Sequence, residues 1–197
     1  MRLVFASNNA HKLSEVREIM PTGVEVLSLH EIGFEREIEE TGTTLEANSM
    51  IKAEAVWTFI SEKRKAGIEK IDGVFADDTG LEIDALHGAP GVYTARWAGE
   101  PAANRRKALQ ELANETNRKA QFRTVVTLIR NNGTVQIEGI VRGTIALKER
   151  GESGFGYDAL FIPDGYDKTF GELPAGVKNN ISHRSRALAG LVNILNH

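Results

Sequence analysis

The stretch that most constrains this chain is residues 73–80, where an apolar run carries two adjacent carboxylates into a small-residue turn. The run Gly-Val-Phe-Ala is typical of a core strand, and Asp77 and Asp78 follow it directly. Side chains alternate along a strand, so the two carboxylates should point to opposite sides, and only one should enter a site. Carboxylates at a strand end suit the binding of a hard cation. The simpler alternative is a polar turn that closes the strand, because Asp and Gly are common in turns.

The composition predicts a soluble globular protein of a single domain with a real core. Hydrophobic residues make up 41% and charged residues 26% of the 197 positions. No apolar run is long enough to span a membrane and the first residues do not resemble a signal peptide, so we expect a cytoplasmic protein without a membrane partner. The absence of cysteine excludes disulfides, thiolate metal sites and a cysteine nucleophile. A net charge of −3 argues against a nucleic-acid partner.

Hydrophobic spacing predicts strand–helix units first and a β-hairpin later. Strands are expected at residues 3–6, 73–77, 122–130, 134–145 and 159–162, with helices ending at Pro21, running from Thr43 to Gly67 and from 101 to 114, and starting near Ser182. A capping box formed by Thr43 and Glu46 should begin the second helix, whose buried stripe is expected at residues 47, 51, 55 and 59. Asn-Asn-Gly at 131–133 is a hairpin turn signal. This order of elements predicts an α/β protein with a mixed twisted sheet and flanking helices.

The segment between the first strand and its helix is a candidate phosphate-binding loop. Free N–H groups and the positive end of the helix dipole meet there, and a lysine lies in the first turn. The candidate residues are Ser7, Asn8, Asn9, Ala10, His11 and Lys12. The spacing is not that of a Walker loop. The alternative is that the serine or an asparagine of this loop simply caps the helix.

Two further segments carry polar side chains that need an explanation. Glu39 and Glu40 precede the second helix, and such an acidic pair is usually solvated. Asn48 and Lys52 stand four residues apart beside the expected buried stripe, and a buried polar pair needs partners, so a ligand is plausible there. The alternative is that Lys52 extends to water.

The C-terminal third adds a cationic helix start and an aromatic loop. His183 and Arg184 place positive charge at the start of the last helix, where it interacts unfavourably with the helix dipole. An electron-rich ligand bound there would make the interaction favourable. Lys178 lies in the loop upstream. The alternative is that His183 and Arg184 simply reach into solvent. The loop 154–158 places two aromatics between glycines, where they can stack on a planar ring or cap the core. A metal carboxylate, lysines, an aromatic ring and a polar cluster together predict a nucleotide site.

Six ordered motifs make the chain similar to a known family. They are SNNAHK (7–12), EETGTTLEAN (39–48), FADDTGLEID (75–84), GAPGVYTARWAGE (88–100), GFGYDALF (154–161) and KNNISHR (178–184). In this order and spacing they closely resemble the inosine triphosphate pyrophosphatase family, of the bacterial XTP/dITP type. The resemblance covers nearly the whole chain. One departure is Asn8, where many members carry glycine.

The resemblance implies a fold, a reaction and a partner. The fold would be a single domain over 1–197, elongated and two-lobed with a central cleft, and the protein would be a homodimer. The reaction would be Mg²⁺-dependent hydrolysis of ITP, dITP and XTP to the monophosphate and pyrophosphate, which clears miscoding bases from the nucleotide pool. The partner is therefore a small-molecule nucleotide.

The resemblance also implies roles for individual residues. Glu40 and Asp78 should bind Mg²⁺, and Asp78 should be the base for the attacking water. The triphosphate should contact residues 7–12, Lys52 and Lys178, with Thr79 beside it. In the loop that also holds Gly156 and Tyr157, Phe155 should stack on the base, whose edge should be read by Asp158, His183 and Arg184.

Three other functions compete with this interpretation. A Maf-like pyrophosphatase for other modified bases has a related architecture, but the motifs KNNISHR and GFGYD count against it. A non-catalytic nucleotide sensor would be expected to lack a metal carboxylate, yet Glu40 and Asp78 are both present. A nucleic-acid-binding module is disfavoured by the acidic charge balance.

Overall fold

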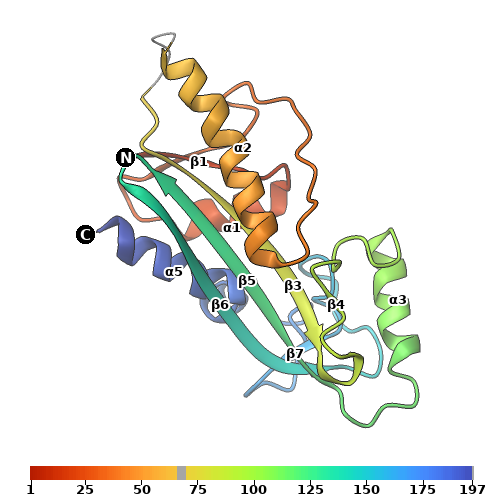
Figure 1. Cartoon of the computed structure of the whole chain (residues 1–197). Coiled ribbons are helices and arrows are strands. Elements are labelled where there is room, and N and C mark those ends of the chain that lie inside the picture. Colours follow the sequence, from red (N-terminus) through yellow and green to blue (C-terminus); the bar gives the residue numbers. More distant parts are fainter. Residues whose placement is uncertain (66–69, 197) are drawn as a thin grey trace. The chain divides into compact units, whose positions relative to one another are not determined.

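The computed structural model describes residues 1–65 and 70–196 (Figure 1). Its helices are α1 (Ala10–Ile19), α2 (Leu45–Lys65), α3 (Pro101–Glu111), α4 (Ala175–Ile181) and α5 (His183–Leu195). Its strands are β1 (Arg2–Phe5), β2 (Glu25–Leu27), β3 (Gly73–Ile83), β4 (Pro90–Gly91), β5 (Lys119–Arg130), β6 (Gly133–Ile145) and β7 (Phe161–Pro163). Within the described part of the chain, no helix has both the length and the apolar character that crossing a bilayer requires.

The strands form one mixed sheet, which confirms the predicted α/β class. The strand order is β2-β1-β3-β5-β6-β7, and β4 pairs with β3. The pairs β1–β2 and β1–β3 are parallel, whereas β3–β4 and β6–β7 are antiparallel. The long strands β5 and β6 are joined by two residues, Asn131 and Asn132, so the predicted hairpin is confirmed.

The chain divides into two compact units that share the three long strands. Unit 1 comprises Met1–Asp78, Val125–Glu138 and Ala187–His197, and unit 2 comprises Thr79–Thr124 and Gly139–Arg186. The expectation of one two-lobed domain with a central cleft stays a prediction.

The sheet of unit 1 is covered on both faces because its strand residues alternate. Val74 and Ala76 of β3 pack in one core with Val56 of α2. Phe75, between them in the sequence, packs in another core with Val16 of α1 and Leu188 of α5. Burial of each large apolar side chain in such a core stabilises the fold by about 1.5–3 kcal/mol. The two cores thus fix α2 on one face of β3 and α1 with α5 on the other (Figure 1).

Two predicted boundaries around β3 and α2 are wrong. Strand β3 does not end at Asp77 but continues through both carboxylates and Thr79 to Ile83. At the start of α2 the hydroxyl of Thr44 accepts a hydrogen bond from the N–H of Ala47 at 3.1 Å, so the cap is one residue later than predicted. The buried face is shifted as well, and consists of Leu45, Asn48, Ser49, Lys52, Ala53, Val56 and Ile60. The predicted end at Gly67 lies outside the described residues.

The other predicted elements are correct in type and inexact at their ends. Helix α1 ends at Ile19, two residues before Pro21, α3 is shorter than expected, and α5 starts after Ser182 as predicted. Sequence periodicity missed β2, β4 and α4, which are too short to show a period. Helix α4 contains Lys178, which was expected in a loop.

Unit 2 has a single core between its part of the sheet and helix α3. Leu81 of β3, Ala108 of α3 and Phe122 of β5 pack in it with Phe161 of β7. Strand β7 approaches β6 closely at Gly143, which pairs with Pro163. A methyl group at Gly143 would overlap the carbonyl oxygen of Ile162.

We therefore expect the substitution Gly143→Ala to lower the free energy of unfolding by about 1–3 kcal/mol through overpacking. Urea denaturation followed by circular dichroism measures this change. The control is Gly176→Ala in α4, where an added methyl group meets no atom within 4 Å and should not destabilise. Equal unfolding midpoints for the two variants would contradict the pairing of β6 with β7.

Candidate functional site

Asp77 and Asp78 are neighbours on β3 and point to opposite faces of the sheet. The Oδ1 of Asp77 accepts a hydrogen bond from the Nζ of Lys12 in α1 at 2.9 Å. The Oδ1 of Asp78 accepts one from the Nζ of Lys52 in α2, also at 2.9 Å. Both carboxylates are buried, with side chains 2% and 9% exposed. The predicted alternation is confirmed, since each carboxylate meets a lysine from the helix that covers its own face.

Lys52 joins Asp78 to Glu40. Its Nζ donates to the Oε1 of Glu40 at 2.8 Å, so one ammonium group bridges two carboxylates. Burial lowers the pKa of Lys52, but the charges of Asp78, Asp77 and Glu40 outweigh it and leave the pKa raised. Burial raises the pKa of Asp78, and Lys52 offsets part of this effect. Lys52 does not extend to water, so that alternative is wrong, and of the acidic pair only Glu39 is fully exposed.

This cluster has the chemistry that a divalent cation requires. Among the residues described, the Oδ2 of Asp78 is buried and lacks a hydrogen-bond partner. The carboxylates of Glu40 and Asp78 share the ammonium group of Lys52, and the carboxylate of Asp77 contacts the ammonium group of Lys12. No group of three or more His, Cys, Asp or Glu side chains is arranged as a metal site within 1–65 and 70–196. Carboxylate oxygens such as the buried Oδ2 of Asp78 fit Mg²⁺, which commonly takes one or two carboxylates and completes its shell with water and phosphate oxygens.

The candidate phosphate loop is organised by Asn9. The Oδ1 of Asn9 accepts hydrogen bonds from the N–H groups of His11 and Lys12 at 3.0 and 3.2 Å. The hydroxyl of Ser7 accepts one from the N–H of Asn9 at 3.2 Å. The capping alternative is thus confirmed for Asn9. Phosphate binding by residues 7–12 stays a prediction. The ammonium group of Lys12 lies against the carboxylate of Asp77.

A second group of the predicted residues surrounds the ring of Phe155 in unit 2. The Nζ of Lys178 lies 5.0 Å and the Cζ of Arg184 5.7 Å from the ring centroid, which are cation–π distances. The Oδ2 of Asp158 accepts hydrogen bonds from Lys178 and from the N–H of Phe155, each at 2.8 Å. A methyl group at Gly154 would overlap this Oδ2. Arg184 is only 2% exposed, so the alternative that it reaches into solvent is wrong.

His183 is held by a short chain of hydroxyl groups. Its Nδ1 is hydrogen-bonded to the hydroxyl of Thr124, which also bonds the hydroxyl of Thr79 at 2.8 Å. The ring stacks on Phe122 with centroids 4.8 Å apart and is 5% exposed. Sequence reasoning missed Thr124, although a polar residue inside the apolar strand 122–130 is a usable signal.

The two remaining residues of the aromatic loop have structural partners. Tyr157 is 2% exposed, its hydroxyl donates to the carbonyl of Thr94 at 3.2 Å, and burial raises its pKa. Tyr157 therefore belongs to the core, as the capping alternative requires, whereas Phe155 is half-buried. The carbonyl of Gly156 accepts a hydrogen bond from Arg105 at 3.0 Å.

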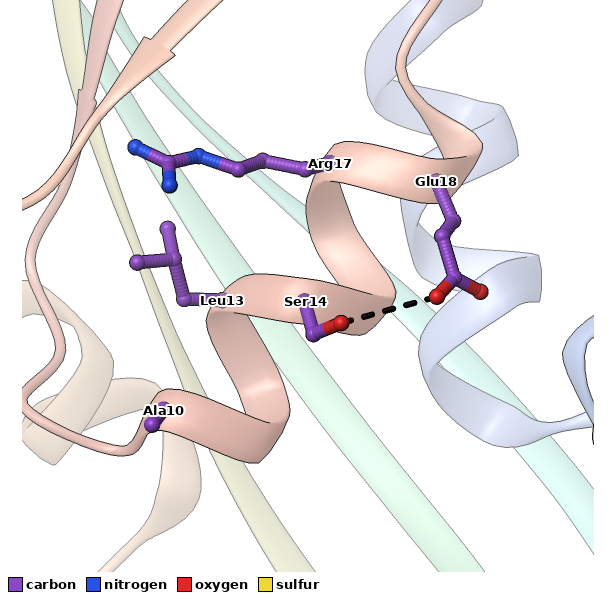
Figure 2. A pocket seen from close by; sticks show the side chains of 5 residues that line it. All are labelled: Ala10, Leu13, Ser14, Arg17 and Glu18. Atoms are coloured by element: carbon purple, nitrogen blue, oxygen red, sulfur yellow. Dashed lines mark hydrogen bonds between the residues drawn. The ribbon is translucent and has the colours of Figure 1, made fainter.

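Two hollows in the described part of the chain lie apart from these clusters. A pocket of about 360 Å³ runs along α1 and is drawn in Figure 2. It is lined by Ala10, Leu13, Ser14, Arg17 and Glu18. Of these, only Ala10 is a predicted site residue, and Arg17 is already used by the carbonyl of Val26 and by Glu31. A pocket of about 670 Å³ in unit 2 contains none of the predicted residues.

Comparisons with known proteins cover the whole chain. The model of the Ham1 family matches residues 3–194. A dITP/XTP pyrophosphatase of Flavobacterium johnsoniae is 44% identical, over 99% of this chain and 98% of its own. The enzymes of the same name from Porphyromonas gingivalis and Bacillus subtilis are 47% and 46% identical, over 98% of this chain and 97% and 96% of theirs.

Two solved structures have a fold similar to that of this chain over nearly its whole length. The Staphylococcus aureus Ham1 protein has a TM-score of 0.86 and 38% identity, and the match covers 100% of this chain and 98% of that one. A nucleoside-triphosphatase, dITP/XTP pyrophosphatase, from Mycobacterium abscessus has a TM-score of 0.75 and 37% identity, over 98% and 99% of the two chains.

The buried pair in unit 2 generates a stability prediction. The substitution Lys178→Met leaves the carboxylate of Asp158 buried without its ammonium partner, so we expect a loss of about 3–5 kcal/mol in the free energy of unfolding. The double variant Lys178→Met with Asp158→Asn should recover part of this loss. Chemical denaturation measures all three proteins, with Lys168→Met, at an exposed lysine of the same unit, as the control. Equal effects at Lys178 and Lys168 would contradict the buried pair.

Proposed function

The chain belongs to the Ham1 family, and from this membership we propose that it is a nucleoside-triphosphate pyrophosphatase. It is a hydrolase that cleaves a phosphoanhydride bond of deaminated purine nucleotides, dITP, XTP and ITP, to give the monophosphate and pyrophosphate. The full-length similarity to three dITP/XTP pyrophosphatases supports the substrate class, and it agrees with the six motifs of the sequence. The observation that carries the proposal is the buried oxygen of Asp78 beside the Lys52–Glu40 pair.

Cleavage between the α- and β-phosphates leaves a highly charged pyrophosphate, so the site must neutralise charge as it develops. Glu40 and Asp78 would hold Mg²⁺, which would supply positive charge to the phosphates and lower the pKa of water. Lys12, Lys52 and Lys178 add positive charge from the protein. Asp78 takes the proton of the attacking water, a role that its raised pKa favours.

Base selection rests on the six-position of the purine. Hypoxanthine and xanthine offer a keto acceptor and an N1–H donor, whereas adenine reverses both. A buried site built for the first pattern leaves its own groups unpaired with adenine, which can reject a substrate by about 10⁴-fold. We assign stacking to Phe155 and the reading of the edge to Arg184, His183 and groups of the same cluster. The position of Arg184 over the ring of Phe155, 5.7 Å from its centroid, and the burial of both side chains support this assignment.

The resemblance also supports two proposals about the state of the protein. We propose that it is a homodimer, which light scattering coupled to gel filtration tests directly. We further propose that it works in the cytoplasm on free nucleotides, with neither nucleic acid nor membrane as a partner.

A substrate panel tests the proposed function. Pyrophosphate release should be fast with dITP, XTP and ITP in the presence of Mg²⁺, and should fall to background after chelation with EDTA. ATP should be slower by orders of magnitude in kcat/KM. Release of orthophosphate instead of pyrophosphate, or equal rates for ITP and ATP, would refute the proposal.

The opposite directions of the two adjacent carboxylates give a sharper prediction. We expect Asp78→Asn to lower kcat for dITP by at least about a hundredfold at saturating Mg²⁺, because a general base contributes about 10²–10⁴-fold. Asp77→Asn is the matched control. It removes the partner of Lys12, so it should lower the free energy of unfolding while kcat falls much less. Near-normal kcat for Asp78→Asn would exclude Asp78 as the base.

A further inference from the structure

Asn48 fastens the segment that carries Glu40 to helix α2. Its side chain is fully buried, and its Oδ1 accepts a hydrogen bond from the N–H of Gly42 at 2.8 Å. Contact is so close that a methyl group at Gly42 would lie 2.6 Å from this Oδ1 and 2.7 Å from the Cβ of Ala47. Asn48 stands one turn before Lys52 on the same side of the helix. The amide therefore ties Glu40, two residues from Gly42, to the helix that supplies its lysine partner.

The other end of the same amide is unsatisfied. The Nδ2 of Asn48 is buried, and the described residues offer it no hydrogen-bond partner. Only two other buried side-chain atoms of the described chain share this condition, the Oδ2 of Asp78 and the Nε of Arg150. Arg150 lies 3.4 Å from a carboxylate oxygen of Glu172, so its charge is compensated.

Among the described residues, the buried donor and the buried acceptor without partners are linked through Lys52 of α2. Lys52 contacts Asp78 directly and shares the buried side of α2 with Asn48. An unpaired buried amide costs free energy, and folded proteins seldom keep one without a functional reason. Because an amide donor is uncharged, it can bind an incoming oxygen without adding positive charge that would oppose a cation.

We infer that Asn48 is a ligand-binding residue of this site as well as a positioning residue for Glu40. Its Oδ1 holds the Glu40 segment, and its Nδ2 donates to an oxygen that arrives with the ligand, either a phosphate oxygen or a water bound to the metal. This inference rests on the proposed function and adds a residue to it.

Two variants separate the roles of the Oδ1 and Nδ2 atoms of Asn48. Asn48→Asp keeps the size of the side chain and an acceptor for the N–H of Gly42 but removes the donor. Asn48→Ala removes both. The matched control is Ser49→Ala, the next residue of α2, which is also fully buried and loses a 3.2 Å hydrogen bond to the carbonyl of Ala76.

We expect both Asn48 variants to lose at least about tenfold in kcat/KM for dITP and in affinity for Mg²⁺–pyrophosphate measured by calorimetry. Ser49→Ala should stay within about threefold of the wild type in both, even where its melting temperature falls equally. Titration of Asn48→Asp, which keeps the contact that positions Glu40, with Mn²⁺ alone identifies the acceptor. Weaker Mn²⁺ binding indicates a metal-bound water, and unchanged Mn²⁺ binding with weaker pyrophosphate binding indicates a phosphate oxygen.

Wild-type values for Asn48→Asp in both assays would overturn the ligand contact, because this variant retains only the acceptor. Gly42→Ala provides a second check on the positioning role. It crowds the Oδ1 of Asn48 and leaves the amide intact, so it should raise the Mg²⁺ concentration needed for half-maximal activity. An unchanged Mg²⁺ requirement would overturn that role. A wild-type protein that releases no pyrophosphate from dITP would refute the proposed function, and calorimetry with Mg²⁺–pyrophosphate would still decide the role of Asn48.

Discussion

Two adjacent carboxylates inside a buried strand need two counter-charges, and these must come from opposite sides. An unpaired buried charge costs several kcal/mol, and strand geometry prevents one cation from serving both Asp77 and Asp78. The chain meets this constraint with one lysine from each helix that covers β3, Lys12 from α1 and Lys52 from α2. Each helix is thus fixed by an ion pair in its N-terminal half and by apolar packing along its length.

The same constraint explains why the observed buried face of α2 differs from the predicted one. The sequence analysis took the buried face to be the apolar positions 47, 51, 55 and 59, and treated Asn48 and Lys52 as neighbours of that stripe. In the structure these two polar residues are part of the buried face, because the carboxylates lie there. Hydrophobic periodicity does not detect a buried helix face that includes polar residues. Knowledge that β3 continues through Asp78 would have corrected the helix as well.

The elements that sequence reasoning found are those with enough residues to repeat a pattern. The hairpin 131–133, the strand–helix units and the grouping of Phe155, Asp158 and Lys178 could be predicted. Strands of two or three residues and the seven-residue helix α4 could not, since their position depends on pairing and packing with distant segments. Thr124 was missed for a related reason: its role arises only when β5 lies beside β3 and supports Thr79 and His183 together.

The discontinuous make-up of unit 1 has a consequence for how the chain is made. Leu188 and Leu191 of α5 pack in one core with Phe5 and Phe75, so β1 is covered on that face by a segment that is synthesised long after it. Contacts so distant in sequence form slowly, and the nascent chain carries exposed apolar surface until α5 emerges. A premature stop before residue 187 would therefore leave the apolar face of β1 exposed, and chaperones would bind the truncated chain at this strand.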